Sequence, residues 1–207
     1  MYAKSAATIQ NILEAARKLF TARSYAEVSM AGIAQQARVT KGALYHHFKS
    51  KEELYLMMMH AYLQEQRDRM RRAVESPGSC RQRLRRLTVD FLSQPANKHR
   101  TMRLVRRDVN IFRGKARQEL IQAYQEALPE QEEAIIRDGI RDGELPGFDA
   151  RLLAWTQVAM VEVVLSQYAR QMLGSPERIA DYVLGLFFEG ASCLEKLPQP
   201  GTMASRN

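Results

Sequence analysis

The sequence has few cysteines, prolines and glycines: two, seven and eleven among 207 residues. Cys80 and Cys193 form no C-x-x-C pair, so neither a disulfide framework nor a zinc ribbon is expected. Apolar residues at 45% and charged residues at 26% are ordinary values, which argues against a disordered or fibrous chain. A chain of this length can bury a core without cross-links.

Long hydrophobic runs are also missing. The most apolar stretch, residues 152–165, contains Thr156, Gln157 and Glu162 and is shorter than the roughly 18 residues that a membrane span needs. Lys4 is followed by a segment too polar for the core of a signal peptide. We therefore expect a soluble, cytoplasmic protein with no membrane partner.

Catalytic and cofactor motifs are absent from the sequence. It contains no Ser-His-Asp pattern, G-x-S-x-G, G-x-G-x-x-G, P-loop or H-E-x-x-H. The adjacent His46 and His47 would point about 100° apart on a helix, and no cysteine or acid stands at ligand spacing. We expect no enzyme activity, no cofactor and no metal site.

What the sequence does contain is helical periodicity, and alternating strand patterns are absent, so we expect an all-α fold of about nine helices. Residues 9–20 carry apolar side chains at spacings of three and four, after Thr8 as a candidate N-cap. Ser29 can cap a helix to Ala37, and Thr40 one to about His47. Ser50 and Glu53 match a capping box at the start of a longer helix to about residue 74.

Further helices are expected over residues 79–93, 97–112, 149–173 and 175–196. Between them, Pro129 either kinks the helical segment 115–142 or opens a second helix. Residues 197–207 are expected to form a loose tail.

Only Arg38 and Val39 separate the second and third predicted helices, which is the spacing of a helix-turn-helix. In the third helix, Lys41 can reach a guanine edge, and the small Gly42 and Ala43 let the backbone approach the bases. The sequence predicts that this helix enters the major groove of DNA.

Over residues 9–54 the sequence resembles the tetracycline-repressor (TetR) family of bacterial regulators. The matching positions are Ile12-Leu13-Glu14-Ala15-Ala16, Leu19-Phe20, Tyr25, Val28-Ser29-Met30, Ile33-Ala34, Ala37, Val39-Thr40-Lys41-Gly42, Leu44-Tyr45, His47-Phe48, Ser50-Lys51-Glu52 and Leu54. Two positions depart from the pattern, since Arg38 and Ser24 stand where the family usually or often has glycine. A side chain in a positive-φ turn costs about 1 kcal/mol.

The resemblance implies a three-helix DNA-binding head, here residues 1–50, and a larger helical ligand-binding and dimerisation domain, here residues 51–196. It also implies that a homodimer binds a palindromic operator in double-stranded DNA. With the chemistry of the third helix, it points to the following DNA contacts: Ser29, Thr40, Lys41, Gly42, Ala43, Tyr45, His46, His47 and Lys51.

The expected helices 149–173 and 175–196 are apolar on more than one face. A helix of this kind must bury more than one side, and pairing with the same two helices of a second chain does this. We expect a homodimer through these last two helices, the alternative being two internal core helices of a monomer.

The net charge of +8 is unevenly distributed. Residues 1–55 carry a net +4, whereas residues 76–120 carry 12 basic and 3 acidic residues, a net +9. This block is a solvated helix face, an additional attraction for DNA, or the mouth of a pocket for an anionic effector. An acyl-CoA suits such a pocket, and some family members use one. The candidate lining is Arg103, Arg106, Arg107, Phe112, Trp155 and Tyr168.

These observations favour a ligand-responsive transcriptional regulator, and a repressor above an activator. Two alternatives stay open: a constitutive architectural DNA-binding protein, and a helical enzyme acting on an anionic substrate.

Overall fold

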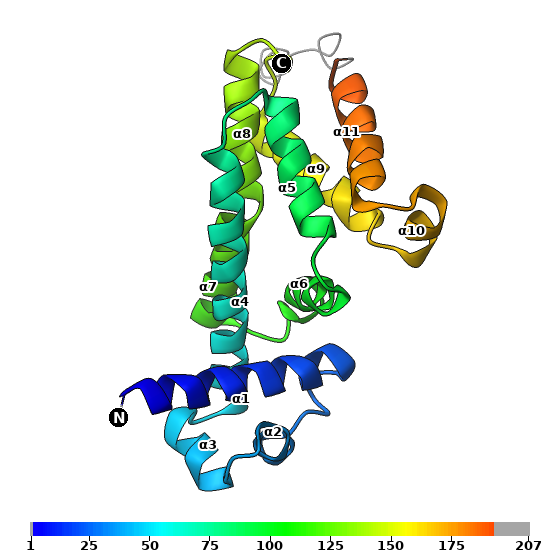
Figure 1. The fold of residues 1–207 in the computed structure, drawn as a ribbon. Helices are drawn as coiled ribbons and strands as arrows, with labels where there is room; N and C mark the ends of the chain where they lie inside the picture. Colours follow the sequence, from blue (N-terminus) through cyan, green and yellow to red (C-terminus); the bar gives the residue numbers. More distant parts are fainter. Residues whose placement is uncertain (1, 193–207) are drawn as a thin grey trace, which may run out of the picture. The chain divides into compact units, whose positions relative to one another are not determined.

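The computed structural model describes residues 2–192, except for the side chains of residues 2–5, 96, 97, 106, 191 and 192. Cys193 and the predicted tail at 197–207 lie outside the described residues. Every regular element in the described range is an α-helix, which confirms the all-α prediction (Figure 1). These helices are α1 (Tyr2–Ala22), α2 (Met30–Ala37), α3 (Lys41–His47), α4 (Lys51–Val74), α5 (Cys80–Leu92), α6 (Ala96–Asp108), α7 (Gly114–Ala127), α8 (Pro129–Arg141), α9 (Ala150–Val163), α10 (Gln167–Leu173) and α11 (Pro176–Ser192).

The described range has eleven helices instead of about nine because two expected segments are each divided. Pro129 opens α8 at its first turn, which is the second of the two alternatives. The prediction of one helix over 149–173 is wrong. The Ser166 hydroxyl accepts a hydrogen bond from the Ala169 N–H at 3.2 Å and so caps a separate α10.

The predicted N-caps near the head are mostly confirmed. The hydroxyls of Ser29 and Thr40 accept hydrogen bonds from the N–H groups three residues on, each at 3.1 Å. Thr8 is not a cap, because α1 begins at Tyr2. The Ser50 hydroxyl accepts from the Glu53 N–H, but the Glu53 carboxylate accepts from the N–H of Lys49 and not of Ser50.

The chain divides into two compact units. The first contains residues 1–65 and 95–124, and the second contains residues 66–94 and those from 125 onward. Within the first unit, α6 packs on α1, and the division after residue 50 into a DNA-binding head and a ligand-binding domain stays a prediction. The Arg17 guanidinium on α1 donates to the Thr101 hydroxyl on α6 at 3.3 Å.

An aromatic cluster lies at the centre of the first unit. The ring of Tyr55 on α4 packs edge-on against Phe20 at 4.8 Å and against Tyr25 at 5.3 Å, and it also contacts Phe112. Tyr55 is fully buried, and its hydroxyl donates to the Asp108 carboxylate at 2.8 Å. Burial and that carboxylate raise the pKa of the Tyr55 phenol.

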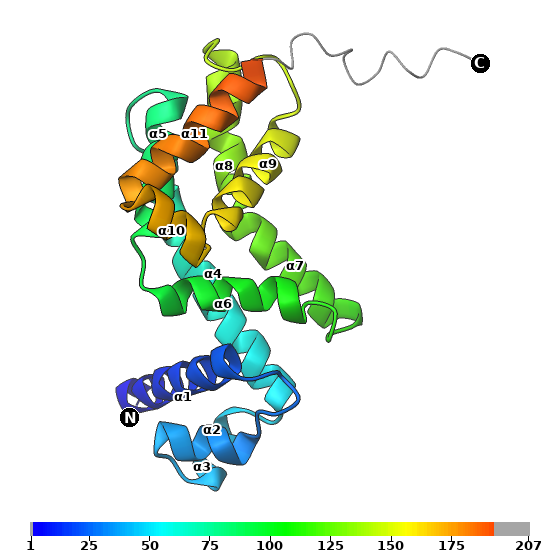
Figure 2. The same ribbon diagram turned by 90° about the vertical axis from the view of Figure 1, so that its right-hand side faces the viewer.

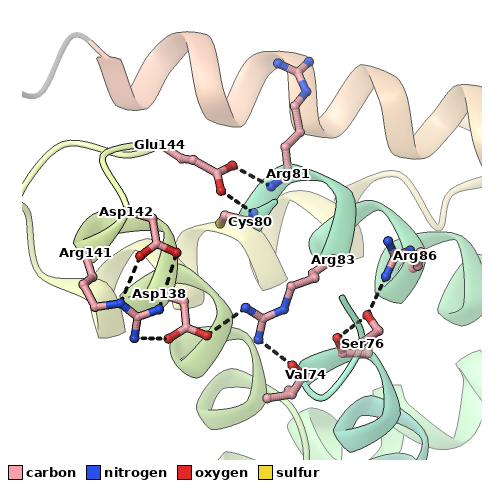
Figure 3. Close-up of polar contacts among 11 residues, drawn as sticks. Val74, Ser76, Cys80, Arg81, Arg83, Arg86, Asp138, Arg141, Asp142 and Glu144 are labelled. Carbon is pink, nitrogen blue, oxygen red and sulfur yellow. Dashed lines mark hydrogen bonds and ion pairs between the residues drawn. The ribbon is translucent and has the colours of Figure 1, made fainter. Parts of the chain in front are cut away.

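In the second unit, α5 packs against α8 and α11, and α9 packs against α8 (Figure 2). The Arg83 guanidinium on α5 donates to Asp138 on α8 at 2.7 Å and to the Val74 carbonyl (Figure 3). The bond from Arg83 holds the pKa of the Asp138 carboxyl below its usual value. Gly139 allows α8 to lie close to the start of α5, because a Cβ at this position would lie 2.6 Å from the Cβ of Cys80.

No helix in the described part of the chain is both long and apolar enough to cross a membrane.

Glu132, in the first turn of α8, is a buried carboxyl whose titration makes the stability depend on pH. Its side chain is 2% exposed with one oxygen unpaired, and burial raises the pKa of its carboxyl well above the usual value. The folded state therefore keeps a proton that the unfolded chain releases above about pH 4.3, so the free energy of unfolding falls as the pH rises through that value.

We expect Glu132→Gln to raise the melting temperature at pH 7.5 and to change it little at pH 4.5. Each unit of pKa elevation corresponds to about 1.4 kcal/mol of lost stability once the unfolded state ionises. Thermal unfolding followed by circular dichroism measures this, with Glu75→Gln, an exposed position directly after α4, as the control. An equal gain at both pH values would contradict a protonated buried Glu132.

Candidate DNA interface

The segment from α2 to α3 forms the expected helix-turn-helix. Ile33 and Ala37 of α2 and Leu44 of α3 are buried, and α2 packs against both α3 and α1. The Asn11 side chain on α1 donates to the Ala37 carbonyl at 2.6 Å and so satisfies the end of α2. The opposite face of α3 is left exposed.

The turn between the helices keeps the geometry for which glycine is suited. Arg38 has φ 55° and ψ 41°, the left-handed conformation, and is the one residue other than glycine with positive φ among those described. Its N–H donates to the Gln35 carbonyl at 3.1 Å, and the Val39 N–H donates to Ala34 at 3.0 Å. These bonds close α2 and offset the cost of about 1 kcal/mol that a side chain incurs there.

Most of the predicted DNA contacts lie on the exposed face. Tyr45 is 44% exposed and is therefore no core residue. The hydroxyls of Ser29 and Thr40 accept hydrogen bonds as N-caps, yet each retains its own proton to donate to a phosphate. The predicted set divides into the exposed Ser29, Thr40, Lys41, Gly42, Tyr45 and His46 and the half-buried Ala43, His47 and Lys51.

Lys51 is turned toward the protein. Its ammonium donates to the carbonyls of Tyr25 and Val28 at 2.8 and 3.0 Å, and it lies 4.4 Å from the centre of the Tyr25 ring. The first residue of α4 thereby holds the loop that leads into α2. Its phosphate contact stays a prediction, and the structure adds this second role.

Four of the residues predicted to line an effector pocket belong to the first unit: Arg103, Arg106, Arg107 and Phe112. Phe112 is buried in the aromatic cluster, and Arg107 is paired with Asp108. Arg103 is exposed on α6, and the side chain of Arg106 lies outside the described residues. In the second unit, Trp155 on α9 and Tyr168 on α10 are 37% and 71% exposed. The effector contacts of all these residues stay a prediction.

A polar network around Asp108 was not predicted. The Arg107 guanidinium donates twice to the Asp108 carboxylate, at 2.6 and 2.8 Å, and reaches the Phe20 carbonyl at the end of α1 at 3.3 Å. Asp108 is 3% exposed and also accepts from Tyr55. The network joins α1, α4 and α6. Local sequence pattern gives no sign of it, because its members lie up to 88 residues apart.

We expect Lys51→Gln to lower the melting temperature because two carbonyls would lose a charged donor, at a cost of about 1–3 kcal/mol. The matched control is Lys49→Gln, an exposed lysine two residues earlier. Thermal unfolding separates the two variants, and a gel mobility shift reports any added loss of DNA binding. Equal melting temperatures for both variants would show that the loop does not need Lys51.

Two sequence models of known families match the chain. "Bacterial regulatory proteins, tetR family" matches residues 12–58, and "Tetracyclin repressor-like, C-terminal domain" matches residues 77–191. The transcriptional regulator TtgR of Pseudomonas putida is 29% identical over 188 residues, which cover 84% of this chain and 88% of TtgR. The regulator YhgD of Bacillus subtilis is 28% identical over 160 residues, or 77% of this chain and 83% of YhgD.

Solved structures share the fold. FadR from Bacillus subtilis in complex with stearoyl-CoA has a TM-score of 0.73 at 20% identity, covering 87% of this chain and 98% of FadR. AibR in complex with isovaleryl coenzyme A and operator DNA has a TM-score of 0.73 at 23% identity, with the same coverage. Since the second family model alone spans more than half of the sequence, the chain belongs to the tetR family of bacterial regulatory proteins and is a DNA-binding transcriptional regulator.

Proposed function

We propose that the chain is a homodimeric repressor that occupies a palindromic operator and leaves it when a small amphipathic anion, such as an acyl-CoA, binds. The observation that carries this proposal is the exposed face of α3, which carries side chains suited to contacts with bases on a helix held by its buried face.

We assign some of the predicted contact residues to the bases and the others to the phosphate backbone. Lys41 is suited to a guanine edge, and Tyr45 and His46 add hydrogen-bond donors on the same exposed helix. Gly42 and Ala43 are small enough for close approach to the bases. The remaining predicted contacts, Ser29, Thr40, His47 and Lys51, are assigned to the phosphate backbone.

Exposed apolar side chains on α9 and α11 support the dimer. Leu152 and Val163 of α9 are 54% and 74% exposed, and Tyr182 and Leu186 of α11 are each 50% exposed. A hollow of about 340 Å³ is lined by residues of both helices, Leu186 among them. A second copy of the same surface would cover these side chains, and its two-fold symmetry matches a palindrome.

The effector class is supported by charge and by related proteins. FadR and AibR were solved with acyl-CoAs, and the fatty acid metabolism regulator of Bacillus subtilis is 25% identical over 145 residues. Arg103 is an exposed cation on α6, the helix that the Asp108 network joins to α1. A displaced α6 would therefore carry the head with it. Trp155, Tyr168, Phe112 and Arg106 remain candidates for contacts with the acyl part.

The proposal includes no catalytic step. We place the protein in the bacterial cytoplasm, since operator DNA lies there.

We expect Lys41→Ala and Tyr45→Ala each to weaken operator binding about tenfold or more, because a good base contact contributes roughly 1–3 kcal/mol. Lys115→Ala, which alters an exposed lysine outside the head, is the matched control. A mobility shift at fixed salt measures affinity, and sedimentation confirms that each variant stays dimeric. Unchanged affinity in both head variants, or footprints without a short palindrome, would favour the architectural alternative.

We expect decanoyl-CoA to release the operator complex in the same mobility shift, whereas free coenzyme A and decanoate leave it intact. Arg103→Gln should require a higher decanoyl-CoA concentration, because one cation for the phosphates is lost. If butyryl-, decanoyl- and palmitoyl-CoA all leave the complex unchanged, the acyl-CoA assignment is wrong, while operator binding stands.

A further inference from the structure

The second unit contains a groove between the C-terminal half of α4 and α5, with a volume of about 200 Å³. Met70, Leu87 and Phe91 supply an apolar floor, and all three are buried. Polar and charged side chains lie around it. The polar lining residues are Gln66, Arg69, Arg72, Ser76, Arg86, Asp90 and Gln94.

Two buried amides in this lining are incompletely paired. Gln66 is 1% exposed and Gln94 is 9% exposed, and the Gln94 amide donates to the Gln66 carbonyl oxygen at 3.0 Å. The Gln66 Nε2 and the Gln94 Oε1 find no partner among the described residues. Buried polar atoms are nearly always hydrogen-bonded, so the pair offers one unused donor and one unused acceptor to a further group.

The groove also has an excess of positive charge. Arg69 pairs with Asp90 at 3.7 Å, which leaves two other arginines in the lining. Arg72 and Arg86 have no carboxylate within ion-pair distance in the described part of the chain. Arg86 donates to the Ser76 hydroxyl at 2.6 Å, just after the end of α4 (Figure 3). Two uncompensated guanidiniums beside an apolar floor are suited to an anion that carries an apolar body.

We propose that this groove is a binding site for a small amphipathic carboxylate. Its carboxylate pairs with Arg72 and Arg86, its apolar body covers Met70 and Phe91, and a hydroxyl or amide on its far side pairs with Gln66 and Gln94 after a side-chain rotation. The volume lies below the roughly 300–1,000 Å³ of sites for drug-sized ligands, so a coenzyme A moiety does not fit. A role for this ligand as the effector rests on the function proposed above, whereas binding itself does not.

Isothermal titration calorimetry on the full chain tests the site with 4-hydroxybenzoate, which has a carboxylate, an apolar ring and a hydroxyl. Its neutral counterpart, 4-hydroxybenzyl alcohol, tests the need for charge. We expect the carboxylate to bind and the alcohol to bind at least tenfold more weakly, because the charged contacts are lost. Arg72→Gln and Arg86→Gln should each weaken carboxylate binding about tenfold. Arg71→Gln, an exposed neighbour facing Glu75 and not in the lining, should leave it unchanged.

Gln94→Leu separates the amide pair from the arginines. It should reduce the affinity for 4-hydroxybenzoate but not for benzoate, which lacks the hydroxyl. Circular dichroism confirms that each variant is folded. No binding of either carboxylate, or equal binding by Arg72→Gln, Arg86→Gln and Arg71→Gln, would overturn the site.

A mobility shift with the operator distinguishes this site from the proposed function. Release of DNA by 4-hydroxybenzoate, lost in Arg72→Gln, supports both. Calorimetric binding without release supports the site and overturns its role as the effector site. Operator binding with no calorimetric signal overturns the site and leaves the regulator intact.

Discussion

A buried carboxylate holds the first unit together. Asp108 at the end of α6 accepts the Tyr55 hydroxyl from α4 and two bonds from Arg107, and Arg107 in turn reaches the carbonyl of Phe20 at the end of α1. Removing Arg107 would take the countercharge away from the buried Asp108 carboxylate and so destabilise this unit. The aromatic rings packed around Tyr55 exclude water from the bond between Tyr55 and Asp108 and so strengthen it. The position of α1, on which α2 packs, depends on this carboxylate.

In the DNA-binding head, polar side chains likewise bind groups that are distant in the sequence. Asn11 donates to the carbonyl that ends α2, and Lys51 donates to two carbonyls of the loop that precedes it. Polar side chains thus satisfy backbone groups that a short helical segment leaves unpaired. Because the buried Leu44 holds α3 by its inner face, the outer face of α3 is left exposed for the side chains that we propose to contact DNA.

Local signals predicted much of this structure, and distant contacts account for most of what they missed. The caps at Ser29 and Thr40 and the short turn between them were visible in the sequence, because capping depends on residues three apart. The end of α9 was not predicted, because the apolar periodicity continues past Ser166. Lys51 was assigned only to DNA because its carbonyl partners lie 23 and 26 residues away. The sequence assigns both Trp155 and Phe112 to an effector pocket because both are aromatic, but Trp155 is 37% exposed and Phe112 is buried in the aromatic cluster.

Long-range ion pairs neutralise some of the arginines in the basic segment 76–120. Residues 76–120 carry a net +9 and residues 121–207 a net −6, and folding places the first part of the basic segment, residues 76–94, in the same unit as the residues from 125 onward. Arg83 pairs with Asp138 and Arg85 with Asp181, so part of the excess charge is neutralised within the second unit. Arg107 is neutralised by its own neighbour in the sequence. The cations that matter for an anionic ligand are the ones left over, and Arg86 is one of them. A count of charges along the sequence identifies the basic segment, but only the pairing in the fold shows which of its arginines remain available.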